Sequence, residues 1–472
     1  MKMHDAIYLN GKWTSSDGDG TLEVVNATTE EVIATVPRGT SSDVARAVEA
    51  ARSAQEGWAV VSVAERAGSL REVAAGLRLR EQELLETIVA EVGTTRALAA
   101  VMQVGIGIDT FVAAADDMEA ADAEERIGNS LVVRVPVGVA GCITPWNYPL
   151  YQVSLKVGPA LAAGCSVVLK PSEVAPLSAF ILAEVIDAVG LPAGVFNLVS
   201  GDGPTVGEAM VMHPEVDAVS FTGSVRAGRR VAELAGASVK RVTLELGGKS
   251  PTIILPGADL EAAVAHGVMS CMNNAGQTCG ALSRMIVLPS IREQVEQLAT
   301  NAATMLRLGD PMDESTRLGP VASAAQRDRV LSYIQRGIDE GAQLLTGGPE
   351  RPSGQPRGYF VQPTVFTAVD PSMTIAREEI FGPVLSIMEA ADEDQALALA
   401  NGTPYALSGA VWASETARAR AVAERLHAST VSINGGRFNP AAPFGGARHS
   451  GYGRERGRFG LEEYLQTKSF QY

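Results

Sequence analysis

The sequence is poor in cysteine and histidine, the side chains that most often form disulfides or bind transition metals. Its 472 residues include four cysteines and five histidines. The cysteines lack the paired spacing of a zinc site or a disulfide framework. We therefore expect no metal site and no disulfides, and a reducing compartment such as the cytoplasm fits this composition.

The chain also lacks an excess of basic residues and a long apolar run. Aspartate and glutamate outnumber lysine and arginine by 54 to 39, for a net charge of −15, whereas a nucleic-acid or anionic-membrane partner would require a basic face. No segment reaches the roughly 18 consecutive apolar residues of a membrane span. Residues 1–30 contain no apolar run typical of a signal peptide. We expect neither a nucleic-acid partner nor a membrane partner.

What the chain does have is a regular alternation of strands and helices. Apolar residues recur at helical spacing over 41–126, with Ser41 or Ser42 as the expected N-cap. After residue 130, short apolar strand patterns alternate with amphipathic helices, and the alternation resumes after residue 250. This order predicts two α/β lobes in series, each with a parallel sheet, and a seam near 248–250. Residues 461–472 read as a strand that must pair with another segment.

One cysteine lies in an unusual setting, the segment NNAGQTCGA over 273–281. Cys279 is flanked by small and polar residues rather than by Val, Leu and Ile. Small neighbours let the backbone bend and let a second molecule approach closely, which suits a thiol that reacts. The alternative is a loop cysteine with no role, and this segment alone does not separate the two.

Two glycine-containing segments are candidates for binding a dinucleotide. In FTGSVRAG, a strand ends at Phe221, and Gly223 and Ser224 open a helix whose free N–H groups favour a pyrophosphate. The alternative is that Ser224 is an ordinary N-cap. The segment GDGPTVG has one residue too many for the G-x-G-x-x-G fingerprint and is weak by itself.

Three further segments place polar residues where a parallel sheet binds ligands. Lys170 and Glu173 follow a strand and are suited to holding ribose hydroxyls, or form a solvated surface pair. Glu245 lies between two leucines at a strand end and suits a general base, unless it points to solvent. Asn147 is held between two prolines and suits a donor to an oxyanion, or belongs to a purely structural turn.

These segments together resemble a known family. Taken in order, PWNYP, KPSE, FTGS, LELGGKSP, GQTC, EEIFGPV and PFGGARHSGYGRE are similar to the motifs of the NAD(P)-dependent aldehyde dehydrogenase superfamily, over essentially the whole chain. The resemblance implies an α/β fold with a Rossmann-like parallel-sheet coenzyme domain over 1–117 and 138–247. It also implies a second α/β catalytic domain over 248–442 and a small β oligomerisation arm over 118–137 and 458–472. Members of this family are dimers or tetramers and bind the dinucleotide without a G-x-G-x-x-G loop.

The resemblance assigns a chemical role to each candidate catalytic residue. Cys279 is the nucleophile that forms a thiohemiacetal with the aldehyde, and Asn147 with the Cys279 backbone N–H forms the oxyanion hole. Glu245 activates the water that hydrolyses the thioester. Lys156 and Glu455 match positions linked to proton relay and support of the site.

The resemblance also implies an NAD site. Lys170 and Glu173 would hold the adenosine ribose, and Glu379 with Phe381 would lie at the nicotinamide side. Glu173 predicts NAD over NADP because its carboxylate repels a 2′-phosphate, although the Lys170 charge leaves NADP open. The full set of expected cofactor-binding residues is Ile143, Thr144, Trp146, Lys170, Glu173, Gly203, Thr222, Gly223, Ser224, Leu246, Glu379 and Phe381.

The expected substrate is a small-molecule aldehyde of bulky, aromatic or semialdehyde type. Tyr148, Phe438 and Phe444 are candidates for an aromatic funnel. Leu155 stands where many family members have a large aromatic residue, which would widen the funnel. Arg437 is a candidate to bind a carboxylate on a semialdehyde, or is a solvated loop arginine.

Two other functions are compatible with the same scaffold. One is an aldehyde dehydrogenase that passes its thioester to coenzyme A, which the retained Glu245 disfavours. The other is a noncatalytic structural protein, which the intact set of Cys279, Asn147 and Glu245 disfavours. A phosphate-dependent glyceraldehyde-type enzyme needs a Cys–His pair, and none of the five histidines lies in a matching motif.

Overall fold

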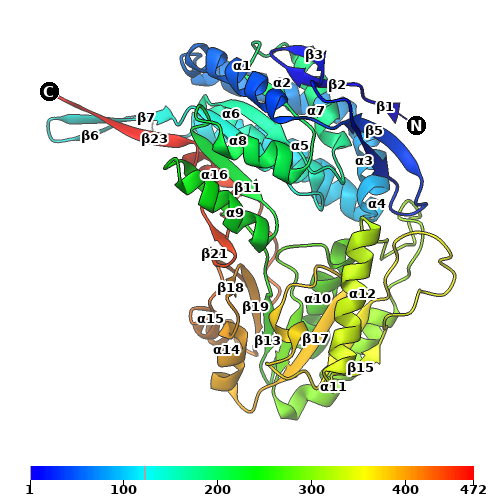
Figure 1. Cartoon of the computed structure of the whole chain (residues 1–472). Helices are drawn as coiled ribbons and strands as arrows, with labels where there is room; N and C mark the ends of the chain where they lie inside the picture. The colour runs from blue at the N-terminus through cyan, green and yellow to red at the C-terminus, as the bar shows by residue number, and fades with distance from the viewer. Residues whose placement is uncertain (1, 122–123) are drawn as a thin grey trace.

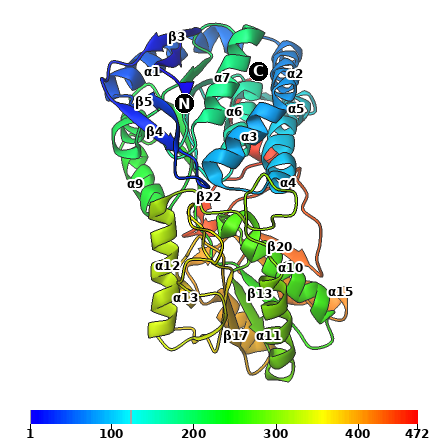
Figure 2. The ribbon, with the colours of Figure 1, turned by 90° about the vertical axis from the view of Figure 1, so that its right-hand side faces the viewer.

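The computed structural model describes residues 2–121 and 124–472. In Figure 1, an upper body and a lower body each contain a sheet, and a β arm projects from the upper body. The view turned by 90° in Figure 2 shows the same two bodies, one above the other. The chain passes from the upper to the lower sheet between Glu245 and Pro251.

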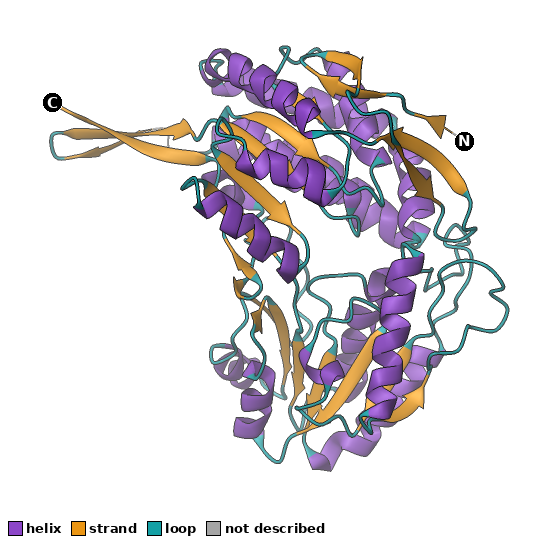
Figure 3. Cartoon of the chain, in the orientation of Figure 1, coloured by secondary structure: helices purple, strands orange, loops and turns teal. Residues whose placement is uncertain are grey.

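The sheet of the upper body has the strand order β22-β12-β11-β8-β9-β10-β2-β3. Its central strands are parallel and fully buried, as expected for a sheet covered by helices on both faces. Figure 3 shows this layering. The strands are β2 (Ala6–Leu9), β3 (Lys12–Ser15), β8 (Val139–Ile143), β9 (Ser166–Lys170), β10 (Phe196–Leu198), β11 (Ala218–Thr222), β12 (Arg241–Glu245) and β22 (Gly451–Tyr452).

The helices of the upper body come mostly from the first half of the chain. They are α1 (Ser41–Ala59), α2 (Val63–Leu79), α3 (Glu81–Val92), α4 (Arg96–Leu98), the π-helix η1 (Ala99–Gly105), α5 (Ile106–Glu119), α6 (Pro149–Ala163), α7 (Leu177–Val189), the π-helix η2 (Gly203–Gly207), α8 (Glu208–Met212), α9 (Val225–Gly236) and α16 (Gly457–Glu462). The helical prediction over 41–126 was wrong at its end, because residues 124–126 pair with β7 as part of a strand.

The N-cap of α1 also differs from the prediction. Thr40, rather than Ser41 or Ser42, occupies the N-cap position. Its hydroxyl accepts the Asp43 backbone N–H, and the Asp43 carboxylate accepts the Thr40 backbone N–H at 2.8 Å. The acidic residue three positions after the threonine therefore decides the start of the helix, as in a capping box.

One helical segment in the described part of the chain, Arg96–Glu119, is long and apolar enough to cross a membrane by length and composition alone, with a mean hydropathy of 1.7 over its best window. It comprises α4, η1 and α5. The last of these packs against α2 and α6, and its Ile108, Phe111 and Ala115 are buried. Core helices of globular domains pass the same test, and this packing is that of a core helix.

The sheet of the lower body has the strand order β15-β16-β17-β14-β13-β19-β20 and is parallel except at β15. The strands are β13 (Pro251–Ile254), β14 (Arg284–Val287), β15 (Gln343–Thr346), β16 (Thr364–Thr367), β17 (Val384–Glu389), β19 (Ser408–Trp412) and β20 (Thr430–Ile433). The helices are α10 (Leu260–Met272), the 3-10 helix η3 (Asn273–Gly276), α11 (Pro289–Thr304), α12 (Ala324–Asp339), α13 (Thr374–Arg377), α14 (Glu393–Asn401) and α15 (Thr416–Ala423).

Three small sheets complete the fold. One joins β1 (Lys2–Met3), β4 (Thr21–Val25) and β5 (Val32–Pro37), and another joins β18 (Tyr405–Ala406) to β21 (Ala447–Arg448). The third is the projecting arm of Figure 1, built from β6 (Glu124–Ile127), β7 (Ser130–Pro136) and β23 (Leu465–Gln471). The strand expected near the end of the chain thus pairs with β7. Residues 122 and 123 of the expected arm lie outside the described residues.

Candidate active site

The segment that carries Cys279 is bent by three consecutive residues with positive φ. Asn274, Ala275 and Gly276 have φ angles of 55°, 54° and 74°, in the left-handed region that most side chains disfavour. A β-carbon at Gly276 would lie 2.1 Å from the Gly382 carbonyl, so this close approach requires glycine. After the bend, Cys279 is partly exposed, whereas the other three cysteines of the chain, all described, are buried.

The thiol of Cys279 is held in its protonated form by its surroundings. Burial raises the pKa of Cys279 to about 12, and the carboxylates of Glu245 and Glu379 add to this rise, while the Arg456 guanidinium opposes it. The thiolate is the nucleophilic form of cysteine. A base that takes the proton of this thiol would therefore make the sulfur nucleophilic.

Glu245 lies at the end of β12, and its charge acts on the Cys279 thiol. Its side chain is buried, and neither carboxylate oxygen has a hydrogen-bond partner among the residues that the structure describes. Burial raises the pKa of Glu245 well above its ordinary value, Glu455 adds to the rise, and Lys156 opposes it. A buried carboxylate with a raised pKa is suited to accept and release protons near neutral pH.

Asn147 follows β8 and is bonded directly to the segment that carries the thiol. Its Nδ2 donates to the Gln277 carbonyl at 2.9 Å, and its own backbone carbonyl accepts from Asn274 Nδ2 at 2.9 Å. A primary amide carries two N–H hydrogens. One hydrogen is therefore left for a substrate oxygen after the bond to Gln277.

A buried ion pair lies beside Glu245. Lys156 of α6 places its Nζ 2.5 Å from Glu455 Oε1, and the two side chains are 1% and 6% exposed. Glu455 is fixed in turn by reciprocal backbone hydrogen bonds with Phe444 of 2.8 and 2.9 Å. The pair thus joins the helix after β8 to the C-terminal segment at the point where Glu245 lies.

We expect Lys156→Met to destabilise the protein strongly. The substitution leaves the Glu455 carboxylate buried without its cation, a change that typically costs about 3–5 kcal/mol. Urea denaturation of the purified variant measures this loss. The matched control is Arg420→Ala, which breaks the Arg420–Glu424 pair, whose side chains are 72% and 63% exposed, and should change stability by less than about 1 kcal/mol. A similar loss of unfolding free energy in both variants would contradict the view that Lys156 neutralises a buried carboxylate of Glu455.

Expected cofactor-binding residues gather at the carboxyl edge of the upper sheet. Ile143 and Lys170 are paired across β8 and β9, and Thr222 and Glu245 are paired across β11 and β12. The ends of these parallel strands therefore lie side by side. Doubly wound sheets bind their ligands in the crevice at this edge.

Polar groups at this edge are arranged to hold a ribose and a phosphate. The buried Lys170 places its Nζ 3.1 Å from Glu173 Oε2. Ser224 caps α9, and its hydroxyl accepts a first-turn backbone N–H at 3.3 Å, so the cap leaves other first-turn N–H groups for an anion. Within the described ranges, the buried hydroxyls of Thr144 and Thr222 have no hydrogen-bond partner. These groups are compatible with a bound dinucleotide.

Gly203 and Leu246 complete the expected set on the upper body. Gly203 begins η2, where a β-carbon would meet no heavy atom of the described chain within 4 Å. Leu246 is buried, and its backbone N–H donates to the Ser450 carbonyl at 3.1 Å. Gly203 is thus exposed to open space, whereas Leu246 is packed inside the protein.

The remaining expected cofactor residues come from the lower body. Gly248 donates its backbone N–H to Glu379 Oε1 at 3.1 Å, and burial raises the pKa of Glu379 to about 7. The Trp146 and Phe381 rings meet edge to face, with centroids 5.4 Å apart. Trp146 follows β8 in the upper body, so this contact spans both bodies.

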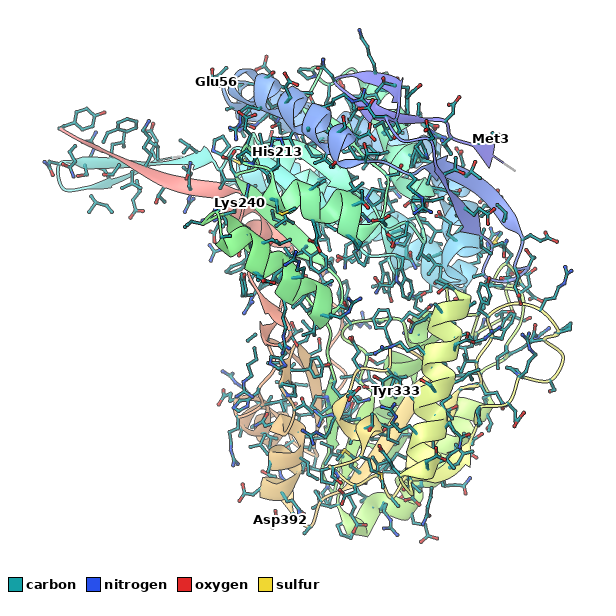
Figure 4. All side chains as sticks on the ribbon, in the orientation of Figure 1. Met3, Glu56, His213, Lys240, Tyr333 and Asp392 are labelled. Atoms are coloured by element: carbon teal, nitrogen blue, oxygen red, sulfur yellow. The ribbon has the colours of Figure 1, made fainter. Side chains whose placement is uncertain are left out.

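Helix α12 supports the segment that carries Glu379. Arg329 donates to the Glu379 backbone carbonyl at 2.8 Å, and the Tyr333 hydroxyl donates to Glu378 Oε2 at 2.7 Å. Figure 4 labels Tyr333 on this helix. The carboxylate of Glu379 is therefore presented by a segment that two side chains of α12 hold in place.

The expected substrate residues differ in burial. Leu155 is buried, Tyr148 and Phe444 are half-buried, and Arg437 and Phe438 are exposed. The Tyr148 hydroxyl lies 2.9 Å from the hydroxyl of the threonine that precedes the reactive cysteine. The Tyr148 hydroxyl thus lies next to the residue before Cys279, whereas Arg437 is exposed to solvent.

Sequence reasoning missed three groups at the site. Gln277 supplies the carbonyl that fixes Asn147. Lys249 is buried, and burial together with the Arg284 charge lowers its pKa to about 7. Arg456 lies over aromatic rings. Gln277 and Lys249 lie within the segments GQTC and LELGGKSP, but their partners come from distant parts of the chain, so the sequence did not show what these residues do.

Comparison with known proteins gives a consistent result over the full length. The model of the aldehyde dehydrogenase family matches residues 13–470. A 3-succinoylsemialdehyde-pyridine dehydrogenase from a Pseudomonas species is 48% identical over 470 residues, which cover 99% of this chain and 98% of that protein.

Solved structures agree with this match. A cysteine-to-alanine mutant of aldehyde dehydrogenase C from Pseudomonas syringae, in complex with NAD+ and octanal, is 47% identical with a TM-score of 0.98 and covers 99% of this chain and 96% of that one. Betaine aldehyde dehydrogenase from Staphylococcus aureus, in complex with NAD+, is 38% identical with a TM-score of 0.96 and covers 99% and 94%. The α/β fold expected from the sequence is thereby confirmed.

Proposed function

This chain belongs to the aldehyde dehydrogenase family, and from that premise we propose how its own residues carry out the reaction. The protein is an NAD-dependent aldehyde dehydrogenase, an oxidoreductase that converts an aldehyde to a carboxylic acid. The observation that carries the proposal is the convergence of a thiol, an amide and a carboxylate from three segments. These groups belong to Cys279, Asn147 and Glu245.

In the proposed mechanism, Glu245 takes the proton of the Cys279 thiol, and the thiolate attacks the aldehyde carbon. The resulting oxyanion accepts hydrogen bonds from the Asn147 amide and from the Cys279 backbone N–H. NAD, when bound, accepts the hydride from the former aldehyde carbon. Glu245 passes the thiol proton on to solvent through the proposed relay and is ionised again. It then removes a proton from water, which attacks the thioester, and the departing thiolate takes up that proton as the acid is released. Lys156 and Glu455 act as the proposed relay and support behind Glu245.

The residues at the carboxyl edge of the upper sheet fit NAD. Lys170 and Glu173 would hold the adenosine ribose, and the first turn of α9 after Gly223 would receive the pyrophosphate. The unpartnered hydroxyls of Thr144 and Thr222 supply further donors. Ile143, Trp146, Gly203 and Leu246 would pack around the cofactor, and Glu379 and Phe381 would hold its nicotinamide side.

We expect Glu173→Gln to relax the preference for NAD over NADP. The substitution removes a carboxylate, 42% exposed, that would repel a 2′-phosphate, while Lys170 stays in place to attract it. The kcat/KM for NADP should rise about tenfold, equivalent to about 1.4 kcal/mol. Glu233→Gln, at an exposed glutamate paired with Arg230, is the control. A wild-type enzyme that already prefers NADP would refute this role.

The proposed substrate is a bulky, aromatic or semialdehyde compound. The half-buried rings of Tyr148 and Phe444 and the aliphatic Leu155 support a roomy apolar channel to the thiol. The similar protein from Pseudomonas is named for a semialdehyde of pyridine. Reduction of NAD with aliphatic, aromatic, amino and carboxylated aldehydes tests the proposal, and a preference for the smallest aliphatic aldehydes would contradict it.

We further propose that the arm mediates a homodimer or homotetramer. The strand β23 exposes all but its first residue, and Ile127 and Phe470 are 58% and 40% exposed. Exposed apolar side chains on strands with free edges favour pairing with another chain. The proposed location is the cytoplasm, where the four free cysteines stay reduced.

Removal of residues 466–472 should convert the protein to a monomer. The deletion takes away most of β23 and leaves β7 without its long partner strand. Light scattering coupled to size exclusion should then give the mass of one shortened chain, slightly below the 49.3 kDa of the full chain, instead of a multiple of it. Phe470→Asp, which keeps the strand but adds a charge, should shift the mass in the same direction. An unchanged multiple of the monomer mass in both variants would exclude the arm as the interface.

A further inference from the structure

Arg456 has a strained backbone and an unusual set of neighbours. Its φ and ψ angles are 74° and 146°, a region that residues other than glycine rarely adopt. Its guanidinium lies 4.4 Å from the Phe444 ring centroid, 4.6 Å from that of Phe438 and 5.8 Å from that of Tyr151. Two of these rings are the ones expected to line the path of the aldehyde.

Arg456 has aromatic rings around its guanidinium but no ion-pair partner among the described residues. No carboxylate of the described residues lies within salt-bridge distance of it, and its buried Nε has no hydrogen-bond partner there. The adjacent Glu455 is already paired with Lys156. The nearby Arg454, by contrast, donates to the carbonyls of Gly446 and Gly453 at 2.9 and 2.6 Å. Arg454 is therefore bonded to backbone carbonyls, whereas the Arg456 guanidinium faces aromatic rings.

The guanidinium and the thiol belong to the same site. Burial raises the pKa of Cys279 and that of Glu245, and the positive charge of Arg456 lowers both values by a smaller amount. Arg437, in contrast, is exposed on its loop. Of these two arginines, Arg456 is the one whose charge reaches the reacting groups.

We propose that Arg456 is a specificity-determining residue that binds a carboxylate carried by the aldehyde substrate at the end away from the reacting carbon. The inference rests on the proposed function and names its substrate class, an aldehyde with a terminal carboxylate. The planar guanidinium matches a carboxylate with two parallel hydrogen bonds, and the rings beneath it pack the carbon chain of the substrate. A neutral aldehyde leaves the half-buried charge uncompensated, which costs binding energy.

The test compares aldehydes that differ only in the terminal carboxylate. The semialdehydes of succinic, glutaric and adipic acid are measured against butanal, pentanal and hexanal with NAD. We expect the wild-type kcat/KM to be at least about tenfold higher for the best semialdehyde than for its neutral counterpart. This comparison needs no variant, so it decides the proposal even if a substitution at Arg456 prevents folding.

Three variants then assign the preference to the side chain. Arg456→Leu should lower kcat/KM for the semialdehyde about 30-fold more than it lowers kcat/KM for the neutral aldehyde of the same length, and the additional loss should appear mainly in KM. Arg456→Lys should keep part of the preference for the semialdehyde, because lysine retains the positive charge. Arg456→Gly relieves the backbone strain of the positive φ but removes the charge, and it should therefore lose the preference as Arg456→Leu does. Arg458→Ala, at an exposed arginine two residues away, is the matched control and should keep the preference.

The outcomes separate this inference from the proposed function. Turnover of neutral aldehydes at least as fast as semialdehydes would leave the proposed function intact and overturn the role of Arg456. Equal loss for both classes in Arg456→Leu would also overturn it, because a purely structural role predicts that result. Loss of the preference in Arg437→Ala but not in Arg456→Leu would move the carboxylate site to Arg437. No turnover of any aldehyde would instead refute the proposed function.

Discussion

Replacing Cys279 with alanine should abolish aldehyde-dependent reduction of NAD, with a loss of at least about 10,000-fold in kcat. The proposed reaction proceeds through a bond between the sulfur and the aldehyde carbon, and alanine cannot form it. The loss should appear in kcat and leave NAD binding intact, because none of the expected cofactor-binding residues is Cys279 and several of them lie at the strand ends of the upper sheet. Formation of NADH followed by absorbance, with calorimetry for NAD binding, measures both.

Cys271→Ala is the matched control for this experiment. Cys271 is buried in the last turn of α10, before the bend that presents Cys279, and its thiol donates to the Val384 carbonyl at 3.3 Å. The control should keep most of the activity and lose some stability, as expected for the removal of a buried sulfur. Activity that survives in Cys279→Ala would exclude the proposed nucleophile, whatever the control shows.

Glu245→Gln should separate the two halves of the reaction. Without the carboxylate, water is no longer activated, and steady-state turnover should fall about 100- to 1,000-fold. If a base other than Glu245 can still deprotonate the thiol, each site should release one equivalent of NADH in a burst and then hold the thioester. Rapid mixing followed by mass spectrometry of the acylated enzyme measures both. Fast turnover in this variant that depends on added coenzyme A would instead favour the acylating alternative.

The pH dependence of the wild-type enzyme provides a second readout of Glu245. Burial raises the pKa of this carboxyl well above its ordinary value, and only the ionised form accepts a proton. Hydrolysis of the thioester should therefore be weak below that raised pKa and increase as the pH rises through it. Glu245→Gln should remove this increase, because glutamine does not titrate. A rising limb that persists unchanged in the variant would assign it to another group.

The sequence predicted most of the upper sheet because its strands are local patterns. The strand patterns expected over 130–146, 166–172 and 216–224 contain the observed strands at 139–143, 166–170 and 218–222, since buried parallel strands need only side chains that fill both faces. The predictions were wrong where contacts with other residues decide whether a segment is a strand and where a helix begins. Residues 124–126 continue a helical pattern but pair with β7, and the helix at residue 40 begins where Thr40 and Asp43 bond to each other.

The amino-acid sequence by itself determined the family, the α/β fold, the reaction class and NAD, because ordered motifs over the whole chain carry that information. Only the tertiary structure decided which groups meet. It brings Glu245 and Cys279 together from different bodies, pairs Lys156 with Glu455, and gives Arg456 rather than Arg437 the aromatic surroundings. The pKa of a group and the specificity of a site are set by burial and by the distances between charges. Burial and these distances depend on contacts between residues that are hundreds of positions apart in the chain. No local sequence pattern contains that information.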